Sequence, residues 1–294
     1  MIDDNKHITC TLIGNGKVGK SFTQLLTKNG VSVNLLGRDY LSKTDIIKLS
    51  DIIIISVNDE AIEHVCESIA SSLKPNTIVS HCSGAIESNV LISAQKQGCH
   101  IASTHPLNTF PTLEAALNTF ANNQHQTYLM AEGDDQALKI LLPLFEKLGF
   151  QTLSIKTSNK AAYHAATVFA CNYLTTLMDL SLQSAQVAGI DKATSWQAVQ
   201  PLLNATLNNI NNNIEQNDIA AALSGPIARG DSMTLEKHLK AFDANNQNIQ
   251  KAYSQLASHT IRLAIKRGEL EESQIQKMQE TLNQETLNKR TQND

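Results

Sequence analysis

The 294-residue chain lacks the features that mark membrane and secreted proteins. Its longest apolar stretch, residues 52–57, is far shorter than the roughly 20 residues that cross a bilayer. The segment Met1–Asn5 shows no basic region followed by an apolar core, so no secretory signal is expected. The five cysteines form no CxxC pair and have no regular spacing, which predicts reduced thiols in a cytoplasmic protein without a membrane partner.

An excess of positive charge is also missing. The formal net charge is −4, and the Lys and Arg residues are scattered, whereas binding to a phosphate backbone needs a concentrated basic face. A nucleic-acid partner is therefore not expected. With 41% hydrophobic and 18% charged residues the chain can bury a substantial core, and its length leaves room for two domains.

Three glycines follow the first predicted strand, residues 8–13, and a helical apolar pattern begins at Val18. A strand, a tight turn and a helix in this order open a dinucleotide-binding βαβ unit. Gly14 would allow the turn, Gly16 would let a pyrophosphate approach the backbone, and Gly19 would let the helix pack close to the strand. The pyrophosphate would lie at the helix N-terminus, where free N–H groups favour an anion. The alternative is a glycine turn without a ligand.

The end of the second predicted strand, residues 31–36, indicates which nicotinamide cofactor fits. NAD-binding units usually carry Asp or Glu here for the ribose 2′-hydroxyl, but this chain has Arg38 and no carboxylate before Asp39. A guanidinium favours the 2′-phosphate of NADP, although Arg38 could also be a surface residue in a turn. The residues predicted to bind the cofactor are Gly14, Asn15, Gly16, Lys17, Val18, Gly19, Arg38, Val57, Asn58 and Ser83.

Strands and helices alternate up to about residue 156. Residues 51–57 are typical of a strand buried on both faces of a parallel sheet, and further strands are predicted at 77–80, 100–103, 127–130 and 152–155. Later segments read as helices, at 159–187, 192–203, 235–242 and 249–267, and residues from 271 onward read as a solvated helix that frays into a disordered tail. The pattern predicts an α/β protein with a doubly wound domain at 1–156 and an all-helical domain at 157–294.

Side chains able to do chemistry follow three predicted strands at the edge where ligands bind in such sheets. Asn58 and Asp59 could contact the nicotinamide ribose or cap the next helix. The segment His81-Cys82-Ser83 brings an imidazole, a thiol and a hydroxyl, and His105 ends the following strand. Two histidines at neighbouring strand ends favour a functional role over a purely structural one.

The same residues could also serve nucleophilic catalysis or metal binding. Cys82 or Ser83 could act as nucleophiles, but each needs a partnering base that the sequence does not show. His81, His105, Cys82 and His164 could form a metal site, but they lack a local ligand spacing such as HExxH. Neither covalent catalysis nor a metal is expected.

The second half carries two further groups of candidates. Lys160, His164 and Asn172 fall on roughly one face of a predicted helix, and burying two titratable groups and an amide is costly without a purpose. The alternative is a polar stripe that faces solvent. The loop at 223–231 presents Arg229, which suits a carboxylate or phosphate on a substrate.

On these residues the chain resembles bacterial Rossmann-like proteins with the helical domain DUF2520. That family is similar to pyrroline-5-carboxylate reductase, ketopantoate reductase and the 6-phosphogluconate-dehydrogenase-like group. The specific marks are His81-Cys82-Ser83-Gly84-Ala85, Thr104-His105-Pro106, Tyr163-His164-Ala165-Ala166 with Asn172, and residues 224–231. The resemblance implies a Rossmann domain, then an all-α 6-phosphogluconate-dehydrogenase-like domain that often dimerises, with the active site in the cleft between them.

In the β-hydroxyacid dehydrogenases of the wider group, a helical lysine and an asparagine four residues later act on the substrate. Lys160 matches the lysine, but His164 stands where the asparagine would be, so their mechanism does not transfer simply. A short-chain dehydrogenase is disfavoured because its motif is Tyr-x-x-x-Lys, whereas Tyr163 follows Lys160.

Residues and resemblance together predict an NADP-dependent oxidoreductase that acts on a small carbonyl, hydroxy acid or imine, and that forms a homodimer through its helical domain. His164 is the first candidate for the proton donor and Lys160 the second. His81 and His105 would position the substrate or relay protons, and Asn172 and Arg229 would hold its polar groups. The alternative is a non-catalytic NADP(H)-binding sensor or regulatory protein.

Overall fold

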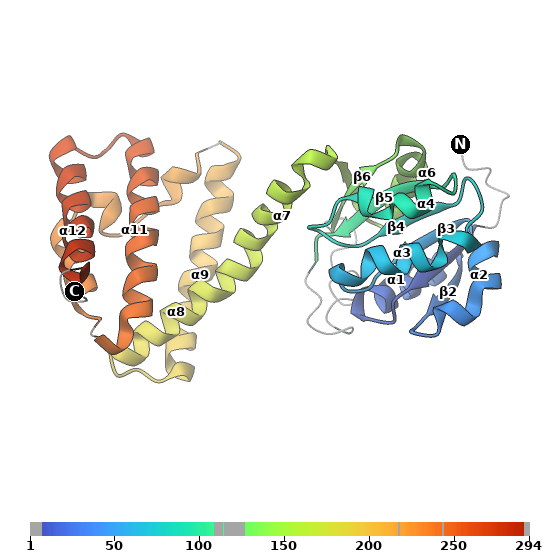
Figure 1. Ribbon diagram of the computed structural model, residues 1–294. Helices are drawn as coiled ribbons and strands as arrows, with labels where there is room; N and C mark the ends of the chain where they lie inside the picture. The colour runs from blue at the N-terminus through green and yellow to red at the C-terminus, as the bar shows by residue number, and fades with distance from the viewer. Residues whose placement is uncertain (1–7, 109–113, 115–126, 217, 243, 291–294) are drawn as a thin grey trace. The chain divides into compact units, whose positions relative to one another are not determined.

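The computed structural model describes residues 8–108, 114, 127–216, 218–242 and 244–290 (Figure 1). Contacts divide the chain into two compact units, Met1–Asn172 and Tyr173–Asp294. This division falls later than the expected boundary after residue 156, so the helix that begins at Lys160 belongs to the first unit. The segment Met1–Asn5, on which the expectation about a secretory signal rests, and the last four residues of the tail lie outside the described ranges.

The first unit is built on a seven-stranded sheet with the order β2-β1-β3-β4-β5-β6-β7. The strands are β1 (Thr9–Ile13), β2 (Ser32–Leu36), β3 (Ile52–Ile55), β4 (Ile78–His81), β5 (His100–Pro106), β6 (Tyr128–Gly133) and β7 (Gln151–Ser154). Neighbouring strands are parallel except that β6 runs antiparallel to β5. The sequence did not indicate this reversal, because an apolar strand reads alike in either direction.

Helices cover both faces of the sheet, which confirms the doubly wound α/β fold (Figure 1). In β3, Ile52 and Ile54 pack in one hydrophobic cluster with α1 (Lys17–Lys28) and α6 (Asp135–Lys147). Ile53 and Ile55 belong to the other cluster, with α2 (Thr44–Leu49), α3 (Ile62–Ile69) and α4 (Ile92–Gln95). Alternate side chains of one strand thus serve opposite faces, as the strand geometry requires. The short 3-10 turns η1 (Tyr40–Lys43), η2 (Asp59–Ala61), η3 (Ala70–Ser72) and η4 (Ser88–Leu91) precede or follow helices of this second cluster, and η5 (Thr157–Asn159) precedes the helix that begins at Lys160.

The long helix expected at 159–187 is interrupted. It consists of α7 (Lys160–Val168), a π-helical turn η6 (Phe169–Tyr173) and α8 (Leu174–Val187). A π-turn is wider than an α-turn, so residues after it do not keep the phase of those before it. The expected stripe is accordingly not uniform: Lys160 is buried, His164 is partly buried and Asn172 is exposed.

The second unit is helical: besides α8 it contains α9 (Lys192–Ile214), α10 (Ser232–Lys240), α11 (Gln247–Arg267) and α12 (Glu272–Arg290), with the turns η7 (Ile219–Ala222), η8 (Ile227–Arg229) and η9 (Ala244–Asn246). The expectation of a merely solvated helix after residue 271 was wrong, because Ile275, Met278 and Leu282 of α12 are buried in the core of this unit. Three apolar residues in one helix suffice to dock it against α10 and α11. Across the ranges that the structure describes, no helix is both long and apolar enough to traverse a bilayer.

Candidate active site

The three glycines of the first turn differ in whether the surrounding atoms leave space for a side chain. Gly14 has a φ of +125°, and a Cβ there would lie 2.4 Å from the carbonyl oxygen of Ser56. A Cβ on Gly19 would lie 2.0 Å from the carbonyl oxygen of Gly14. A Cβ on Gly16 would meet no atom within 4 Å. Packing therefore requires glycine at two of the three positions but does not account for Gly16.

Gly16 faces a cavity of about 470 Å³ at the start of α1, which we call the glycine-turn cavity. Gly16 is also the N-cap of α1 and supplies no capping side chain, and the N-terminus of a helix favours an anion. Arg38, which follows β2 in the sequence, also lines this cavity. The predicted cofactor residues that line it are Gly14, Asn15, Gly16, Arg38, Val57 and Asn58.

A second cavity, of about 410 Å³, adjoins the first, because Ser56, Val57 and Asn58 line both. We call it the histidine cavity, since His105 and His164 are in its wall. Two further predicted cofactor residues, Val18 and Ser83, line the histidine cavity. Lys17 and Gly19 line neither cavity.

The two imidazoles of the histidine cavity meet at Gly84. Their ring centroids are 5.8 Å apart and the rings are nearly perpendicular. A Cβ on Gly84 would lie 2.5 Å from Nδ1 of His164 and 2.8 Å from Nε2 of His105. Only glycine leaves space for both rings, so the residue after Ser83 determines how close the histidines lie.

His105 has a fixed partner on its other nitrogen, because Nδ1 lies 2.7 Å from the hydroxyl of Tyr163. Burial, together with the nearby His164 and Lys160, lowers the pKa of His105 to about 4. Burial also raises the pKa of Tyr163. At neutral pH the pair is therefore an uncharged imidazole and an uncharged phenol that share one hydrogen bond.

His81 is completely buried and lines neither cavity. Its Nδ1 accepts the backbone N–H of Ser83 at 3.2 Å, and its Nε2 lies 3.3 Å from the carbonyl oxygen of Glu87, to which it donates. Burial, with the charge of Lys160, lowers the pKa of His81 to about 4. Both ring nitrogens are thus engaged by backbone, and the structure places His81 under the loop rather than at a ligand.

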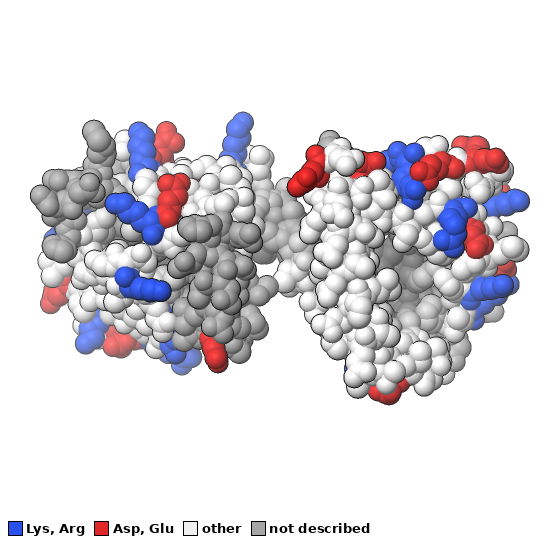
Figure 2. Space-filling view, turned by 180° about the vertical axis from the view of Figure 1, so that it is seen from behind, with Lys and Arg blue, Asp and Glu red and all other residues white. Residues whose placement is uncertain are grey.

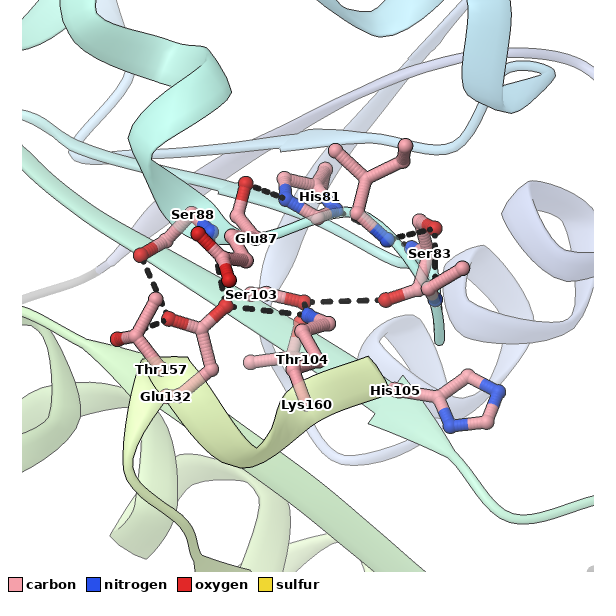
Figure 3. A network of polar contacts seen from close by, with 12 residues as sticks. His81, Ser83, Glu87, Ser88, Ser103, Thr104, His105, Glu132, Thr157 and Lys160 are labelled. Atoms are coloured by element: carbon pink, nitrogen blue, oxygen red, sulfur yellow. Dashed lines mark hydrogen bonds and ion pairs between the residues drawn. The ribbon is translucent and has the colours of Figure 1, made fainter. Parts of the chain in front are cut away.

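Lys160 is buried in an ion pair. Its Nζ lies 3.1 Å from Oε1 of Glu132, and the two side chains are 3% and 1% exposed (Figure 3). Nζ also donates to Oγ of Ser103. The carboxylate of Glu132 accepts further bonds from the N–H and hydroxyl of Ser88, at 2.8 and 2.7 Å, and from the hydroxyl of Thr157, at 2.8 Å.

The surroundings lower the pKa of both members of this pair. Burial lowers the pKa of Lys160, and Glu132 offsets part of that effect. Burial also opposes the charge of Glu132, but the hydrogen bonds from Ser88, the charge of Lys160 and the hydroxyl of Thr157 outweigh it and lower the pKa of the carboxyl. Every polar atom of the pair therefore has a partner, which a buried charge needs.

The bonds continue into a closed ring (Figure 3). The hydroxyl of Ser103 donates to the carbonyl of Ser83 at 3.2 Å. The N–H of Ser83 donates to Nδ1 of His81, and Nε2 of His81 donates to the carbonyl of Glu87. The N–H of the next residue, Ser88, donates to Glu132 and closes the ring. We call this set the polar ring; its members are His81, Ser83, Glu87, Ser88, Ser103, Glu132 and Lys160. It fixes the segment 82–87, which carries Gly84, and Figure 3 shows His105 lying apart from it.

Comparison with known proteins agrees with this architecture. Residues 28–106 match the model of a Rossmann-like domain, and residues 127–260 match that of the domain of unknown function DUF2520. The chain is a Rossmann-like protein with a DUF2520 domain. A search of curated proteins finds no match to it.

Several solved structures share the fold of this Rossmann–DUF2520 protein. A protein from Thermotoga maritima is 21% identical, with 88% of this chain and 99% of the other covered and a TM-score of 0.65. An imine reductase from Myxococcus stipitatus in complex with NADP+ is 17% identical, with 88% and 95% covered and a TM-score of 0.60. A pyrroline carboxylate reductase from Plasmodium falciparum with NADP bound is 13% identical, with 87% and 98% covered and a TM-score of 0.52.

The site of the Rossmann–DUF2520 protein draws on both matched stretches within its first unit. Gly84 and His105 come from the Rossmann-like stretch, and Glu132, Lys160 and His164 come from the DUF2520 stretch. Glu132 was missed by sequence reasoning, although a glutamate directly after the apolar residues 129–131 of a strand is a signal for a buried carboxylate.

The remaining candidates have other surroundings. The hydroxyl of Ser83 donates to Asp59 at 2.9 Å and accepts the N–H groups of Ala85 and Ile86, so it is fully engaged. Burial raises the pKa of Cys82 to about 12, which keeps it a thiol and a poor nucleophile. Within the described ranges no cluster of three or more His, Cys, Asp or Glu side chains could hold a metal ion.

Two predicted substrate residues are not among those that the first unit brings together. Asn172 is exposed in the π-helical turn at the end of that unit. Arg229 belongs to the second unit, where it is exposed on η8 and its carbonyl accepts a bond from Gln274 at 3.2 Å. Nearby, Asp231 caps α10 by accepting the N–H of Thr234 at 3.0 Å.

Proposed function

We propose that the protein is an NADP-dependent oxidoreductase that transfers a hydride between the nicotinamide and a small carbonyl, hydroxy acid or imine. Gly16 is the observation that carries the proposal. The protein's own packing leaves a side chain room at this position, yet the residue is glycine, at the N-terminus of α1 and on a cavity wall. A pyrophosphate close to the backbone accounts for it.

The cofactor fits the two adjoining cavities. Gly16 and the N–H groups of α1 would hold the pyrophosphate, and Arg38 would hold the 2′-phosphate. The nicotinamide half would extend past Val57 and Asn58, which both cavities share. The NADP in the imine reductase and the pyrroline carboxylate reductase supports this choice of cofactor.

The histidine cavity would receive the substrate. The bound cofactor supplies the hydride, and the chain supplies orientation and proton transfer. His164 lies in the wall and would exchange a proton with the substrate, while the neutral His105, held by Tyr163, would orient a polar group. Lys160 is committed to Glu132, so we assign it to support of the loop rather than to the reaction.

The charge of the cavity favours one substrate class among the three. Its wall contains the carboxylate of Asp59 and, in the described part of the chain, no lysine or arginine. A protonated imine or amine is stabilised by a nearby carboxylate, whereas a carboxylic acid substrate is repelled. The imine is therefore the substrate class that we favour.

Replacement of Gly16 by alanine tests the proposal directly. Gly16 has φ −84° and ψ −172°, which alanine also adopts, so the free energy of unfolding should change by less than about 1 kcal/mol. The affinity for NADPH should fall roughly 10-fold or more, because the added Cβ occupies the approach of the pyrophosphate. Isothermal titration calorimetry measures the affinity and urea unfolding the stability. Unaltered NADPH binding would contradict the proposed cofactor site.

Replacement of Arg38 by alanine tests the preference for NADP. Loss of the guanidinium should weaken NADPH binding by roughly 10- to 100-fold and leave NADH binding nearly unchanged, because only NADPH carries the 2′-phosphate. Lys43→Ala, which removes an exposed cation from η1 outside both cavities, is the control for a general loss of charge. Equal losses for the two cofactors would rule out a 2′-phosphate contact.

A non-catalytic NADP(H)-binding sensor is the second candidate. It would need the glycine-turn cavity but not the pair of imidazoles around Gly84. Oxidation of NADPH in the presence of a panel of cyclic imines and keto acids separates the two functions. Binding without oxidation of NADPH by any member of the panel would favour the sensor.

We further propose that the protein forms a homodimer through α8 and α9. These two helices together bury a single residue, Ser195, and they leave large apolar side chains exposed. The exposed fractions reach 66% for Leu202 and 40% for Trp196. Between residues 174 and 214 the charged residues are only Asp179, Asp191 and Lys192, and the face of the second unit in Figure 2 has wide areas without charge. Such surfaces are usually covered by a partner.

Light scattering after size-exclusion chromatography tests the dimer. The expected mass is twice the 32.1 kDa of one chain. Leu202→Glu should shift the protein toward the monomer, because it places a charge in the apolar surface of α9, whereas Glu280→Gln on the exposed side of α12 should not. A monomeric mass for the unaltered protein at micromolar concentration would refute the proposal.

A further inference from the structure

The two ring nitrogens of His105 have different surroundings. Nδ1 lies 2.7 Å from the hydroxyl of Tyr163, a residue of α7 that lines neither cavity. Nε2 is next to Gly84 in the wall of the histidine cavity, since a Cβ on Gly84 would lie 2.8 Å from it. What a ligand in this cavity meets therefore depends on which of the two nitrogens carries the proton of the neutral imidazole.

The Nε2 atom of His105 can be reached from the cavity. No residue that the structure describes forms a hydrogen bond with it. In the same part of the chain, two side-chain polar atoms are both buried and unpaired, Nδ2 of Asn108 and Nε of Arg267, and Nε2 of His105 is not among them. An unpaired nitrogen that is not buried retains surface, so a ligand can bond to it.

The hydrogen bond between Tyr163 and His105 has a favoured direction. Its length of 2.7 Å is typical of a hydroxyl donor, whereas N–H donors form bonds of about 2.9–3.0 Å. If Nδ1 donated instead, the hydroxyl would have to donate elsewhere, and no described residue accepts from it. Burial lowers the pKa of His105 to about 4, so the ring carries a single proton at neutral pH. Tyr163 therefore donates to Nδ1, and the proton of the imidazole is on Nε2.

We propose that Tyr163 is a positioning residue that holds His105 with its proton on Nε2, so that the histidine cavity presents a neutral hydrogen-bond donor beside Gly84. The inference rests on the proposed function, in which His105 orients a polar group of the substrate. That group is then an acceptor, such as a carbonyl, ether or hydroxyl oxygen.

The charge of the cavity limits this acceptor further. Asp59 in the same wall repels an anion, and the described part of the wall contains no lysine or arginine to balance one. The acceptor is therefore an uncharged oxygen rather than a carboxylate. This narrows the favoured imines to those that carry a neutral oxygen near the reacting carbon.

Tyr163→Phe tests the assignment, because it removes the hydroxyl and keeps the ring that packs edge-on against His105. Long-range ¹H–¹⁵N spectra of protein labelled at histidine distinguish the two tautomers, and the signals of His105 are those that disappear in His105→Gln. In the unaltered protein at neutral pH, Nε2 should be the protonated nitrogen. In Tyr163→Phe both nitrogen signals should shift toward those of a mixture of tautomers. The kcat/KM for the imine that reacts fastest should fall roughly 10-fold, mainly through a higher KM.

Tyr253→Phe is the matched control. It removes the hydroxyl from a pair of the same kind in the second unit, where Tyr253 lies 2.7 Å from Nδ1 of His238. The spectrum of His105 and the turnover should stay unchanged. Adenosine 2′,5′-bisphosphate lacks the nicotinamide and reaches only the glycine-turn cavity, so its affinity should stay within about 2-fold in each variant. Retained binding of this compound also shows that each variant is folded.

A proton on Nδ1 of His105 in the unaltered protein would overturn the assignment, and so would unshifted His105 signals in Tyr163→Phe. A changed tautomer with unchanged kcat/KM would overturn the role of the donor in substrate binding. Neither spectrum requires NADPH. Failure of the unaltered protein to bind NADPH would instead overturn the proposed function, while the spectra would still report the tautomer of His105.

Discussion

Gly84→Ala is expected to lower turnover roughly 100-fold while the protein stays folded. The new Cβ would lie 2.5 Å from Nδ1 of His164 and 2.8 Å from Nε2 of His105, which no real contact permits. Both obstructing atoms are in side chains, so the rings can swing aside and the backbone can remain. Displacement of a reacting group by about 1 Å is enough for such a loss of rate.

Two measurements separate this effect from unfolding. The imidazole nitrogen resonances of His105 and His164 should shift in Gly84→Ala, and the affinity for adenosine 2′,5′-bisphosphate should not change. Ala85→Ser is the control, because it enlarges an exposed neighbouring side chain that lines neither cavity; it should keep turnover within about 2-fold. The assay uses the imine or carbonyl compound that the unaltered protein turns over fastest. Full turnover by Gly84→Ala would remove the paired imidazoles from the reaction.

The sequence predicts those parts of the fold that depend on the spacing of neighbouring residues. The glycine turn and the run of isoleucines in β3 follow from spacing within a few residues. The polar ring could not be predicted, because Glu132 meets Ser88, Thr157 and Lys160 across separations of 25 to 44 residues. Which partners a buried carboxylate finds depends on the order of the strands, and periodicity does not contain that information.

The two strand-end histidines illustrate the same limit. Both follow apolar strands, and nothing local distinguishes them. In the sheet His81 pairs in register with Ser103, and β5 continues to Pro106, so His105 lies two residues further along and reaches the cavity. His81 remains within the sheet and bonds to the loop above it. Register therefore decides which of two similar residues can meet a ligand.

Lys160→Met is expected to destabilise the first unit by about 3–5 kcal/mol. The substitution keeps the length of the side chain but leaves the carboxylate of Glu132, 1% exposed, without its cation. Removing one member of a buried pair costs far more than the pair contributes, because the remaining charge has lost both water and its partner. Lys240→Met is the matched control: it breaks an ion pair with Glu236 whose side chains are 67% and 52% exposed, and it should cost less than about 1 kcal/mol.

The double substitution Lys160→Met with Glu132→Gln distinguishes loss of charge balance from loss of packing. Glutamine removes the uncompensated charge, so the double variant should be more stable than Lys160→Met alone. Hydrogen exchange of β5 and β6 is the suitable measurement, because a single melting temperature would mix the two units of the chain. If Lys160→Met proved as mild as Lys240→Met, the ion pair would not be what holds the segment with Gly84 in place, and the lysine would be free for the reaction after all.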